Sequence, residues 1–118
     1  MESGWIKLNR KILDWGWYKD VNTKAVFLHL LLTANTEDKE FKGEVIHRGE
    51  VATSIGNLAK SVGITYDQAR TALSHLKQTT EITSKQMPKH LVISITNYER
   101  YQDRPKQIPS KSQANPND

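Results

Sequence analysis

The stretch Ser54–Gln78, SIGNLAKSVGITYDQARTALSHLKQ, limits the possible folds of this chain more than any other segment. It predicts a short helix over about Ile55–Ser61, a tight turn, and a second helix. Gly63 suits the left-handed backbone position that such a turn needs, and Thr65 can cap the second helix with its hydroxyl. Apolar residues recur in the second helix at i, i+3, i+4 and i+7, which predicts one buried stripe made of Ala69, Ala72, Leu73 and Leu76.

The other side of the second helix is rich in hydrogen-bonding groups and nearly free of carboxylates. Its outward residues are expected to be Tyr66, Gln68, Arg70, Thr71, Ser74, His75 and Gln78. A helix-turn-helix inserts a second helix of this kind into the major groove of DNA. A two-helix hairpin with a glycine turn is also a common packing unit, and a polar outer face is ordinary for a surface helix. The flanking segments therefore have to decide between these two interpretations.

The segments before this stretch offer elements for a core. Gly4–Leu13 is predicted as a short amphipathic helix, and Trp15 and Trp17 follow it in an aromatic-rich connection that can clamp it onto the body. Tryptophans that stayed exposed would instead mark a surface for a partner or for self-association. Asn22 is predicted to cap a helix over about Thr23–Ala34, which is apolar almost all round and so belongs in the middle of a domain. The residues that the first helix offers to the core are Trp5, Ile6, Leu8, Ile12 and Leu13.

Two β segments flank the helix-turn-helix. Before it, Phe41–Ile46 has strand character around Gly43, and Glu50–Thr53 is expected to pair with this segment or to extend it. After it, Glu81–Met87 and His90–Thr96 predict the two strands of a hairpin. A hairpin directly after a recognition helix is a wing, and the whole order of elements is that of a winged helix. The residues at its tip that are expected to reach phosphate are Lys85, Gln86, Lys89 and His90.

The predicted fold class is therefore α+β and mainly helical, a winged helix-turn-helix with a C-terminal β-hairpin wing. Residues 1–102 are expected to form one DNA-binding domain, closed by a short turn or helix at Asn97–Gln102. From Asp103 the chain holds three prolines and almost no apolar residue except Ile108. Such a segment cannot bury enough surface to offset its ordering entropy, so residues 103–118 are predicted to be a disordered tail or linker.

Composition and missing motifs narrow the function. The net charge of +4 favours a polyanionic partner, and the lack of cysteine excludes a disulfide scaffold and cysteine-bearing zinc fingers. There is no G-x-x-x-x-G-K, H-E-x-x-H or G-x-S-x-G motif, and the four histidines lack ligand spacing. His29 is expected to be a buried or half-buried core residue. No enzyme activity, catalytic residue, metal or cofactor is predicted. Without a signal peptide or an apolar run that could cross a bilayer, the expected location is cytoplasmic, with no membrane partner.

The segment IHRGEVATSIGNLAKSVGITYDQARTALSHLKQ, followed by EIT and by LVISITNYERYQ, resembles the N-terminal winged-helix domain of the DnaD-like replication initiators, or replisome organisers, of bacteria and their phages. The opening GWIKLNRKILDWGWYKD and the apolar VFLHLLLTAN are similar to the start of the same family. The resemblance spans about Gly4–Gln102. It implies binding of double-stranded DNA near a replication origin, self-association through the N-terminal part, and loading of replisome proteins by a separate C-terminal domain.

The sequence departs from this family in three places. Gly56, followed by Asn57, stands where the family often has a basic residue, which removes one expected phosphate contact. Thr79 and Thr80 stand where a glycine usually ends the recognition helix, so the turn into the wing must form without that permissive residue. These 118 residues hold no counterpart of the C-terminal loading domain. The expectation is a chain cut at the linker, or one that acts alone as a phage-encoded accessory or regulatory protein.

The predicted DNA contacts fall into three groups. Phosphates are expected to be neutralised by Lys60, Arg70, Lys77, Lys85 and Lys89, with strong salt dependence. Hydroxyls that fix the register on the duplex are Ser54, Thr65 and Thr71. Bases are expected to be read by Tyr66, Gln68, Arg70, Thr71 and Ser74.

So few positive charges predict modest affinity for a monomer, and a homo-oligomer on DNA is therefore expected. Two other functions remain open for the same fold. One is a phage transcriptional regulator, and the other is a winged-helix module that binds proteins.

Overall fold

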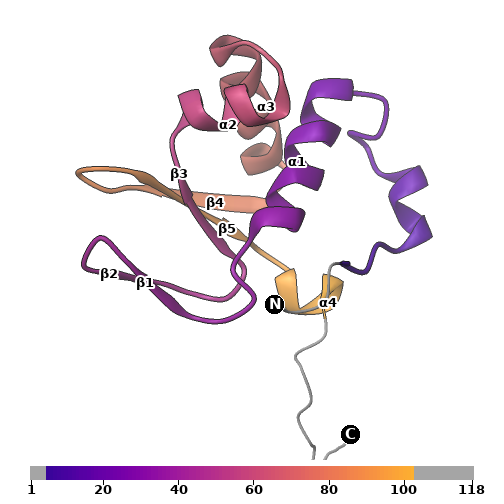
Figure 1. The fold of residues 1–118 in the computed structure, drawn as a ribbon. Helices are drawn as coiled ribbons and strands as arrows, with labels where there is room; N and C mark the ends of the chain where they lie inside the picture. The colour runs from indigo at the N-terminus through magenta and orange to yellow at the C-terminus, as the bar shows by residue number, and fades with distance from the viewer. Residues whose placement is uncertain (1–4, 103–118) are drawn as a thin grey trace, which may run out of the picture.

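The computed structural model describes residues 5–102, and its helices and strands alternate in short segments (Figure 1). Their order along the chain is a 3₁₀ helix η1 (Arg10–Asp14), α1 (Val21–Thr33), β1 (Lys39–Phe41), β2 (Glu44–Ile46), β3 (Glu50–Thr53), α2 (Ile55–Val62), α3 (Tyr66–Gln78), β4 (Ile82–Gln86), β5 (Leu91–Ile95) and α4 (Tyr98–Tyr101). None of these helices is long and apolar enough to span a bilayer.

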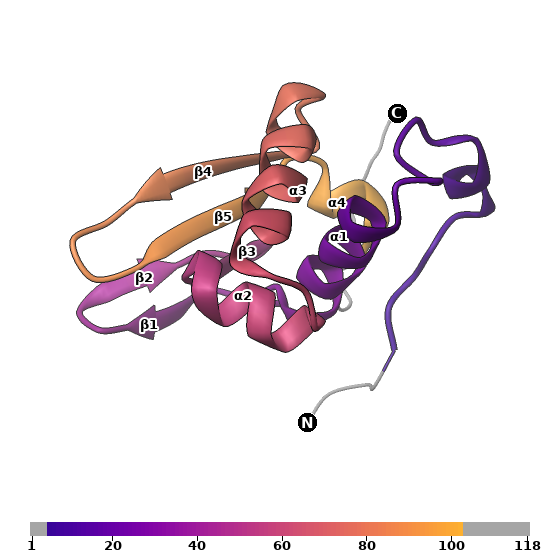
Figure 2. The ribbon, with the colours of Figure 1, turned by 90° about the horizontal axis from the view of Figure 1, so that it is seen from above.

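The strands form two small antiparallel sheets. One has the order β3-β5-β4, and the other is the β1–β2 hairpin. The helices α1, α2 and α3 lie together on one side of the three-stranded sheet, while the β1–β2 and β4–β5 hairpins project in the same direction (Figures 1 and 2). The N-terminal segment lies on the opposite side of α1 from the hairpin tips. The predicted α+β class is confirmed at this level.

The core lies where α1, α3 and the three-stranded sheet meet. The stripe predicted on α3 is confirmed, since each of its four residues is at most 4% exposed. It packs against the buried side of α1 and the inner face of β4 and β5. The buried residues of these partners include Val26, Phe27, Leu30, Leu31, Ile82, Ile93 and Ile95. The prediction that α1 lies in the middle of the domain, because it is apolar almost all round, needs a correction: its apolar Val21 and Leu32 are 69% and 63% exposed.

The turn between α2 and α3 forms as the sequence predicts. Gly63 takes the left-handed conformation, with φ of 90°, and its N–H donates to the carbonyl of Ala59. Thr65 caps α3 by accepting from the N–H of Gln68, and the side chain of Gln68 accepts from the N–H of Thr65. This reciprocal pair is a capping box, which satisfies two N–H groups that the helix cannot bond itself.

The start of α1 was predicted wrongly. Its N-cap is Asp20, whose carboxylate accepts from the N–H of Thr23, so the helix begins at Val21 and Asn22 lies inside it. Asp and Asn cap helices about equally well, and the carboxylate also favours the positive end of the helix. His29 is half-buried within α1, as expected.

The predicted helix over Gly4–Leu13 is also wrong. The described part of this segment is irregular up to η1, and Trp5, Leu8 and Leu13 are 70%, 47% and 61% exposed. The reason is a tertiary contact: the side-chain amide of Gln102 accepts from the N–H of Lys7 at 2.9 Å and donates to its carbonyl at 3.0 Å. This pair of bonds occupies both backbone groups of Lys7, which a helix would need for itself.

Glu50–Thr53 does not pair with the segment before it. It forms β3 and pairs with β5, with Val51 opposite Ile93. Phe41–Ile46 instead closes on itself as the β1–β2 hairpin, because Lys42 and Gly43 both have positive φ, 52° and 84°. Two consecutive left-handed residues make the tight turn whose twist suits a two-residue hairpin.

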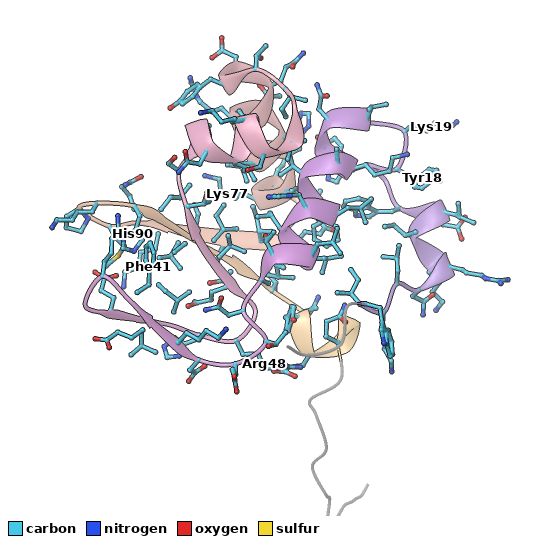
Figure 3. All side chains as sticks on the ribbon, viewed as in Figure 1. Tyr18, Lys19, Phe41, Arg48, Lys77 and His90 are labelled. Atoms are coloured by element: carbon cyan, nitrogen blue, oxygen red, sulfur yellow. The ribbon has the colours of Figure 1, made fainter. Side chains whose placement is uncertain are left out.

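The β1–β2 hairpin contacts the tip of the β4–β5 hairpin at His90. Figure 3 shows Phe41 of this hairpin beside His90, and the two rings meet edge to face at 5.2 Å. Nε2 of His90 lies 3.4 Å from Oε1 of Glu44, and neither ring nitrogen makes a hydrogen bond within residues 5–102. The prediction that His90 reaches phosphate from the tip is therefore wrong, because its side chain is 7% exposed.

Arg48 joins the loop after α1 to the C-terminal segment that contains α4. Its guanidinium, in a side chain only 6% exposed, donates to Glu99 Oε2, to the carbonyl of Thr36 and to the carbonyl of Gln102. The same group lies 4.9 Å from the centre of the Tyr98 ring. Burial raises the pKa of the Tyr98 hydroxyl; Arg48 lowers it and Glu99 raises it. The closing helix predicted near Asn97–Gln102 is thus confirmed as α4, held from beneath by Arg48.

Gly49 allows Tyr98 to sit directly against the backbone. Its φ is +83°, and a Cβ at this position would lie 2.8 Å from Cβ of Tyr98. Such a separation is closer than side chains tolerate, and the left-handed backbone adds strain for any residue with a Cβ.

We expect Gly49→Ala to lower the free energy of unfolding by about 2–4 kcal/mol in urea titrations, through clash and backbone strain together. Gly43→Ala is the matched control, because Gly43 has φ of +84° but nothing within 4 Å of the added Cβ. It should cost only about 1–2 kcal/mol. Equal losses in the two variants would contradict the role given to Tyr98.

Thr80 carries backbone strain at the junction of α3 and β4. Its φ is +61°, an unusual value for a β-branched residue. The N–H of Thr80 donates to the carbonyl of Lys77, and the N–H of Glu81 donates to that of Leu76. This pattern is the Schellman motif, in which glycine normally takes the left-handed position. The turn thus forms without glycine, and its geometry is the usual one for a helix end.

Thr80→Gly should therefore raise the free energy of unfolding by about 0.5–1 kcal/mol, because relief of the left-handed strain exceeds the entropy that glycine adds to the unfolded chain. Thr83→Gly on β4 is the control and should lower stability by a similar amount, since no strain is relieved there. Thermal melts of both variants measure this. A lower melting temperature for Thr80→Gly would show that the turn is not strained.

Candidate nucleic-acid interface

The outward face of α3 is a polar surface that lies opposite a buried apolar stripe. At 100° per residue, Asp67, Thr71, Ser74 and Gln78 lie opposite the stripe. Tyr66, Arg70 and Lys77 fall within about 40° of one another on one flank. All seven residues are exposed, and Tyr66 is 53% exposed. The structure therefore brings together most of the residues predicted to read bases.

His75 does not belong to this face, contrary to the prediction. Its ring stacks on Trp17, with centroids 4.3 Å apart and planes 8° apart. Nδ1 lies 2.9 Å from Oγ1 of Thr23 and 3.2 Å from Oδ2 of Asp20. Because His75 turns toward α1, the flank with Tyr66, Arg70 and Lys77 is the one that faces away from α1.

The predicted hydroxyl contacts are partly occupied by helix capping. Ser54 caps α2 by accepting from the N–H of Asn57, and Thr65 accepts from the N–H of Gln68. Each hydroxyl still has its proton to donate, so both can bond a phosphate oxygen at a helix N-terminus, where backbone dipoles also favour an anion. Gln68 lies on the flank shared with His75, and its carbonyl oxygen is used in the capping box. Only its NH₂ group remains for a base.

Positive charge exceeds negative charge over residues 54–96 because acidic residues are scarce there. Residues 54–96 contain five lysines and arginines and two acidic residues, a net charge of +3 out of the chain's +4. One of these acids, Glu81, is bound by Trp15 and Thr79. Lys60, Arg70 and Lys77 are exposed on α2 and α3. None of the five cations makes an ion pair with another residue in the range 5–102, so their charge is not neutralised locally.

The β4–β5 hairpin divides its side chains between two faces. Lys85 pairs with Val92, so it points to the face of the sheet away from α3. Ser84 pairs with Ile93 and faces the helices. Lys89 lies in the exposed turn at the tip. Lys85 therefore reaches the α3 side only around the free edge of β4, whereas Ser84 is aligned with it.

Sequence reasoning missed two residues of this surface. Asp67 is a carboxylate near the centre of the outward face of α3, a face that the sequence analysis described as nearly free of carboxylates. A carboxylate in the major groove accepts from the amino group of cytosine and repels phosphate, so it favours selective contacts. Ser84 could have been found from the period-2 alternation that begins at the buried Ile82.

Among residues 5–102, no three His, Cys, Asp or Glu side chains gather in a way that could hold a metal ion. A hollow of about 450 Å³ lies beside the N-terminal segment, and its lining includes Leu8, Ile12, Trp15 and Phe27.

Comparison with protein-family models, curated proteins and solved structures finds no match.

Gln68→Ala is expected to lower the free energy of unfolding by about 0.5–1 kcal/mol, because α3 loses one half of its capping box. Gln68→Glu should keep the stability, since glutamate makes the same bond and favours the positive helix end. Gln78→Ala, at the exposed far end of α3, is the control and should change little. Urea titrations distinguish these results. An unaffected Gln68→Ala would show that the capping box adds nothing.

Proposed function

We propose that this protein binds double-stranded DNA through a winged helix-turn-helix, with α3 as the recognition helix and the β4–β5 hairpin as the wing. The observation that supports this most is the geometry of α3. Four alanines and leucines are buried as one stripe, and Tyr66, Arg70, Thr71 and Ser74 project outward without acidic neighbours except Asp67. This is the arrangement that a helix needs in order to enter a major groove.

The net positive charge of residues 54–96 also supports DNA binding by this surface. The excess of +3 over residues 54–96 would attract the phosphate backbone, and release of counterions would make the affinity fall steeply with salt. Phosphate contacts from Lys60, Lys77 and Lys89 would position the protein without reading sequence. Base reading would fall mainly to Arg70 and Ser74, with Asp67 adding selectivity.

The biological role proposed is initiation of DNA replication, on the resemblance of the sequence to DnaD-like initiators of bacteria and phages. One test is to select the sequences that the protein binds from a library of random duplexes. The protein is then footprinted on genomic DNA of its source organism. Protection of a repeat array at an origin would support this role. Protection of a promoter operator would instead favour a transcriptional regulator. If no duplex is bound even at low salt, the proposal fails, and a protein-binding module becomes the better description.

We also propose that the protein self-associates through its N-terminal segment, with replisome proteins as further candidate partners. The support is the exposure of Trp5, Leu8 and Leu13, three large apolar side chains within nine residues, beside the hollow lined in part by Ile12 and Trp15. Apolar groups gathered in this way are typical of interaction surfaces. Measuring the mass in solution tests it, and a dimer that Trp5→Ser and Leu13→Ser together convert to monomer is the expected result.

Arg70→Ala should weaken binding to duplex DNA about tenfold or more and flatten the salt dependence, while the melting temperature stays nearly constant. The side chain of Arg70 is exposed and makes no ion pair with residues 5–102, so its loss should leave the fold intact. Lys11→Ala is the matched control, since it removes one exposed positive charge from η1, far along the chain from α3. A gel-shift titration measures both. Equal affinities for the two variants would show that α3 is not part of the DNA-binding interface.

A further inference from the structure

Four apolar residues form a second stripe on α1, on the side that does not face the core. Val21, Ala25, Leu28 and Leu32 follow one another at intervals of four, three and four residues. At about 100° per residue they lie within about 60° of one another around the helix. Val21 and Leu32, at the two ends, are 69% and 63% exposed, while Ala25 and Leu28 are half-buried. The fold therefore leaves this side of α1 apolar and accessible.

The stripe is turned away from α3. Oγ1 of Thr23 lies 2.9 Å from Nδ1 of His75, so the side of α1 that bears Thr23 faces α3. By helical rotation Thr23 lies roughly 180° from the middle of the stripe. A partner that covered the stripe would therefore leave the polar outward face of α3 uncovered.

The N-terminal segment runs along one flank of α1 beside the stripe. The Tyr18 ring lies 4.0 Å from Nζ of Lys24, and the ring of Trp15 packs against Phe27 with centroids 4.9 Å apart. Leu13, two residues before Trp15, is 61% exposed. The stripe is thus continuous with the surface for which self-association is proposed.

The spacing of the stripe is that of a seam between two helices. Apolar residues at alternating intervals of three and four are the positions through which paired helices pack side by side. If two copies of α1 run antiparallel about a two-fold axis, Val21 meets Leu32 of the second copy and Ala25 meets Leu28. Each pair joins a larger side chain to a smaller one, so the two identical surfaces interdigitate. The stripe is therefore complementary to itself.

The charges on α1 favour a second copy over a charged partner. Lys24 is the only Lys, Arg, Asp or Glu within Val21–Thr33, and it lies on the flank that contacts Tyr18. Two copies of Lys24 would lie about 8 Å apart along the paired helices and further apart across them, where salt weakens their repulsion. α1 offers no carboxylate that would select a basic helix, since partner choice in such seams is set by flanking charges.

We propose that two copies of this protein form a dimer in which their α1 stripes pack antiparallel about a two-fold axis. This inference rests on the proposed self-association and names its central seam; it does not depend on DNA binding. Between Val21 and Leu32 the seam is only about 17 Å long. It is smaller than the roughly 800 Å² per chain of a standard interface, so the expected dissociation constant is on the order of 10 µM or weaker.

Cysteine cross-linking tests the arrangement on a clean background, because the chain contains no cysteine. In the proposed dimer Val21 faces Leu32 of the other copy, whereas two copies of the same residue lie about 17 Å apart. A disulfide spans at most about 7 Å between Cα atoms. An equal mixture of Val21→Cys and Leu32→Cys should therefore form a covalent dimer under mild oxidation, seen on a non-reducing gel, while each variant alone should stay monomeric. No dimer in the mixture, or equal cross-linking of one variant with itself, overturns the antiparallel seam.

Sedimentation over a range of protein concentrations gives an independent readout. Val21→Gln/Leu32→Gln should raise the dissociation constant at least about tenfold, because both ends of the seam become polar. The melting temperature of the monomer should be unchanged, since both side chains are exposed in it and glutamine is a good helix former. Val45→Gln is the matched control: Val45 is 55% exposed on β2, and its loss should leave the dimer intact.

The remaining outcomes separate this inference from the proposals on which it builds. A native protein that stays monomeric up to about 500 µM overturns both the seam and the proposed self-association. A dimer that Trp5→Ser/Leu13→Ser dissociates, but that the glutamine pair leaves intact, overturns the seam and assigns self-association to the N-terminal segment alone. Neither result bears on duplex binding, which is measured separately by the gel shift.

Discussion

The packing of α1 against α3 is the interaction on which the rest of the structure depends. Both helices bury aliphatic side chains in their shared seam, and the inner face of β4 and β5 closes it from below. Thr23 is fully buried in the same seam, and its hydroxyl meets Nδ1 of His75. A polar contact inside an apolar seam fixes the rotation of one helix relative to the other, since any other rotation would leave these groups unpaired. The outward face of α3 is thereby defined.

The RGE and NYERYQ segments acquire a common explanation from the structure. Arg48 binds the backbone at Thr36 and Gln102 and the carboxylate of Glu99, while Gly49 leaves room for Tyr98. Gln102 then binds both backbone groups of Lys7. The two ends of the described chain are therefore joined on the side that bears α4, while α3 lies on the other (Figure 1). These segments do not contribute to the α3 surface; they stabilise the body that supports it.

Local patterns predicted α2, the turn at Gly63 and α3 well because their determinants lie close together in sequence. The buried stripe of α3, the left-handed Gly63 and the cap at Thr65 each depend on residues within one or two turns. The errors arose where distant residues decide. Gln102 keeps Lys7 from a helix, β5 takes the pairing partner expected for Phe41–Ile46, and the β1–β2 hairpin buries His90. Spacing of residues along the chain carries no information about such contacts.

The candidate surface was predictable to a similar degree, and for the same reason. The 3.6-residue periodicity of apolar residues in α3 separates inward from outward positions, so Tyr66, Arg70 and Ser74 could be placed from sequence alone. His75 could not, because only the stacked Trp17 and the carboxylate of Asp20 turn it inward. Lys85 could not be placed either, since the face it occupies depends on the register of β4 with β5.

Thr80 takes a left-handed position that glycine usually occupies at a helix end, and contacts from distant residues support the turn there. A glycine at this position would form the helix end without strain, and the turn would then need no outside support. With threonine there, the turn keeps the Schellman pattern, and indole donors from residues more than sixty positions away bind on either side of it. Strain at one end of α3 is thus balanced by contacts from the N-terminal segment. Trp15, Trp17 and the left-handed Thr80 therefore belong to one arrangement at this end of α3.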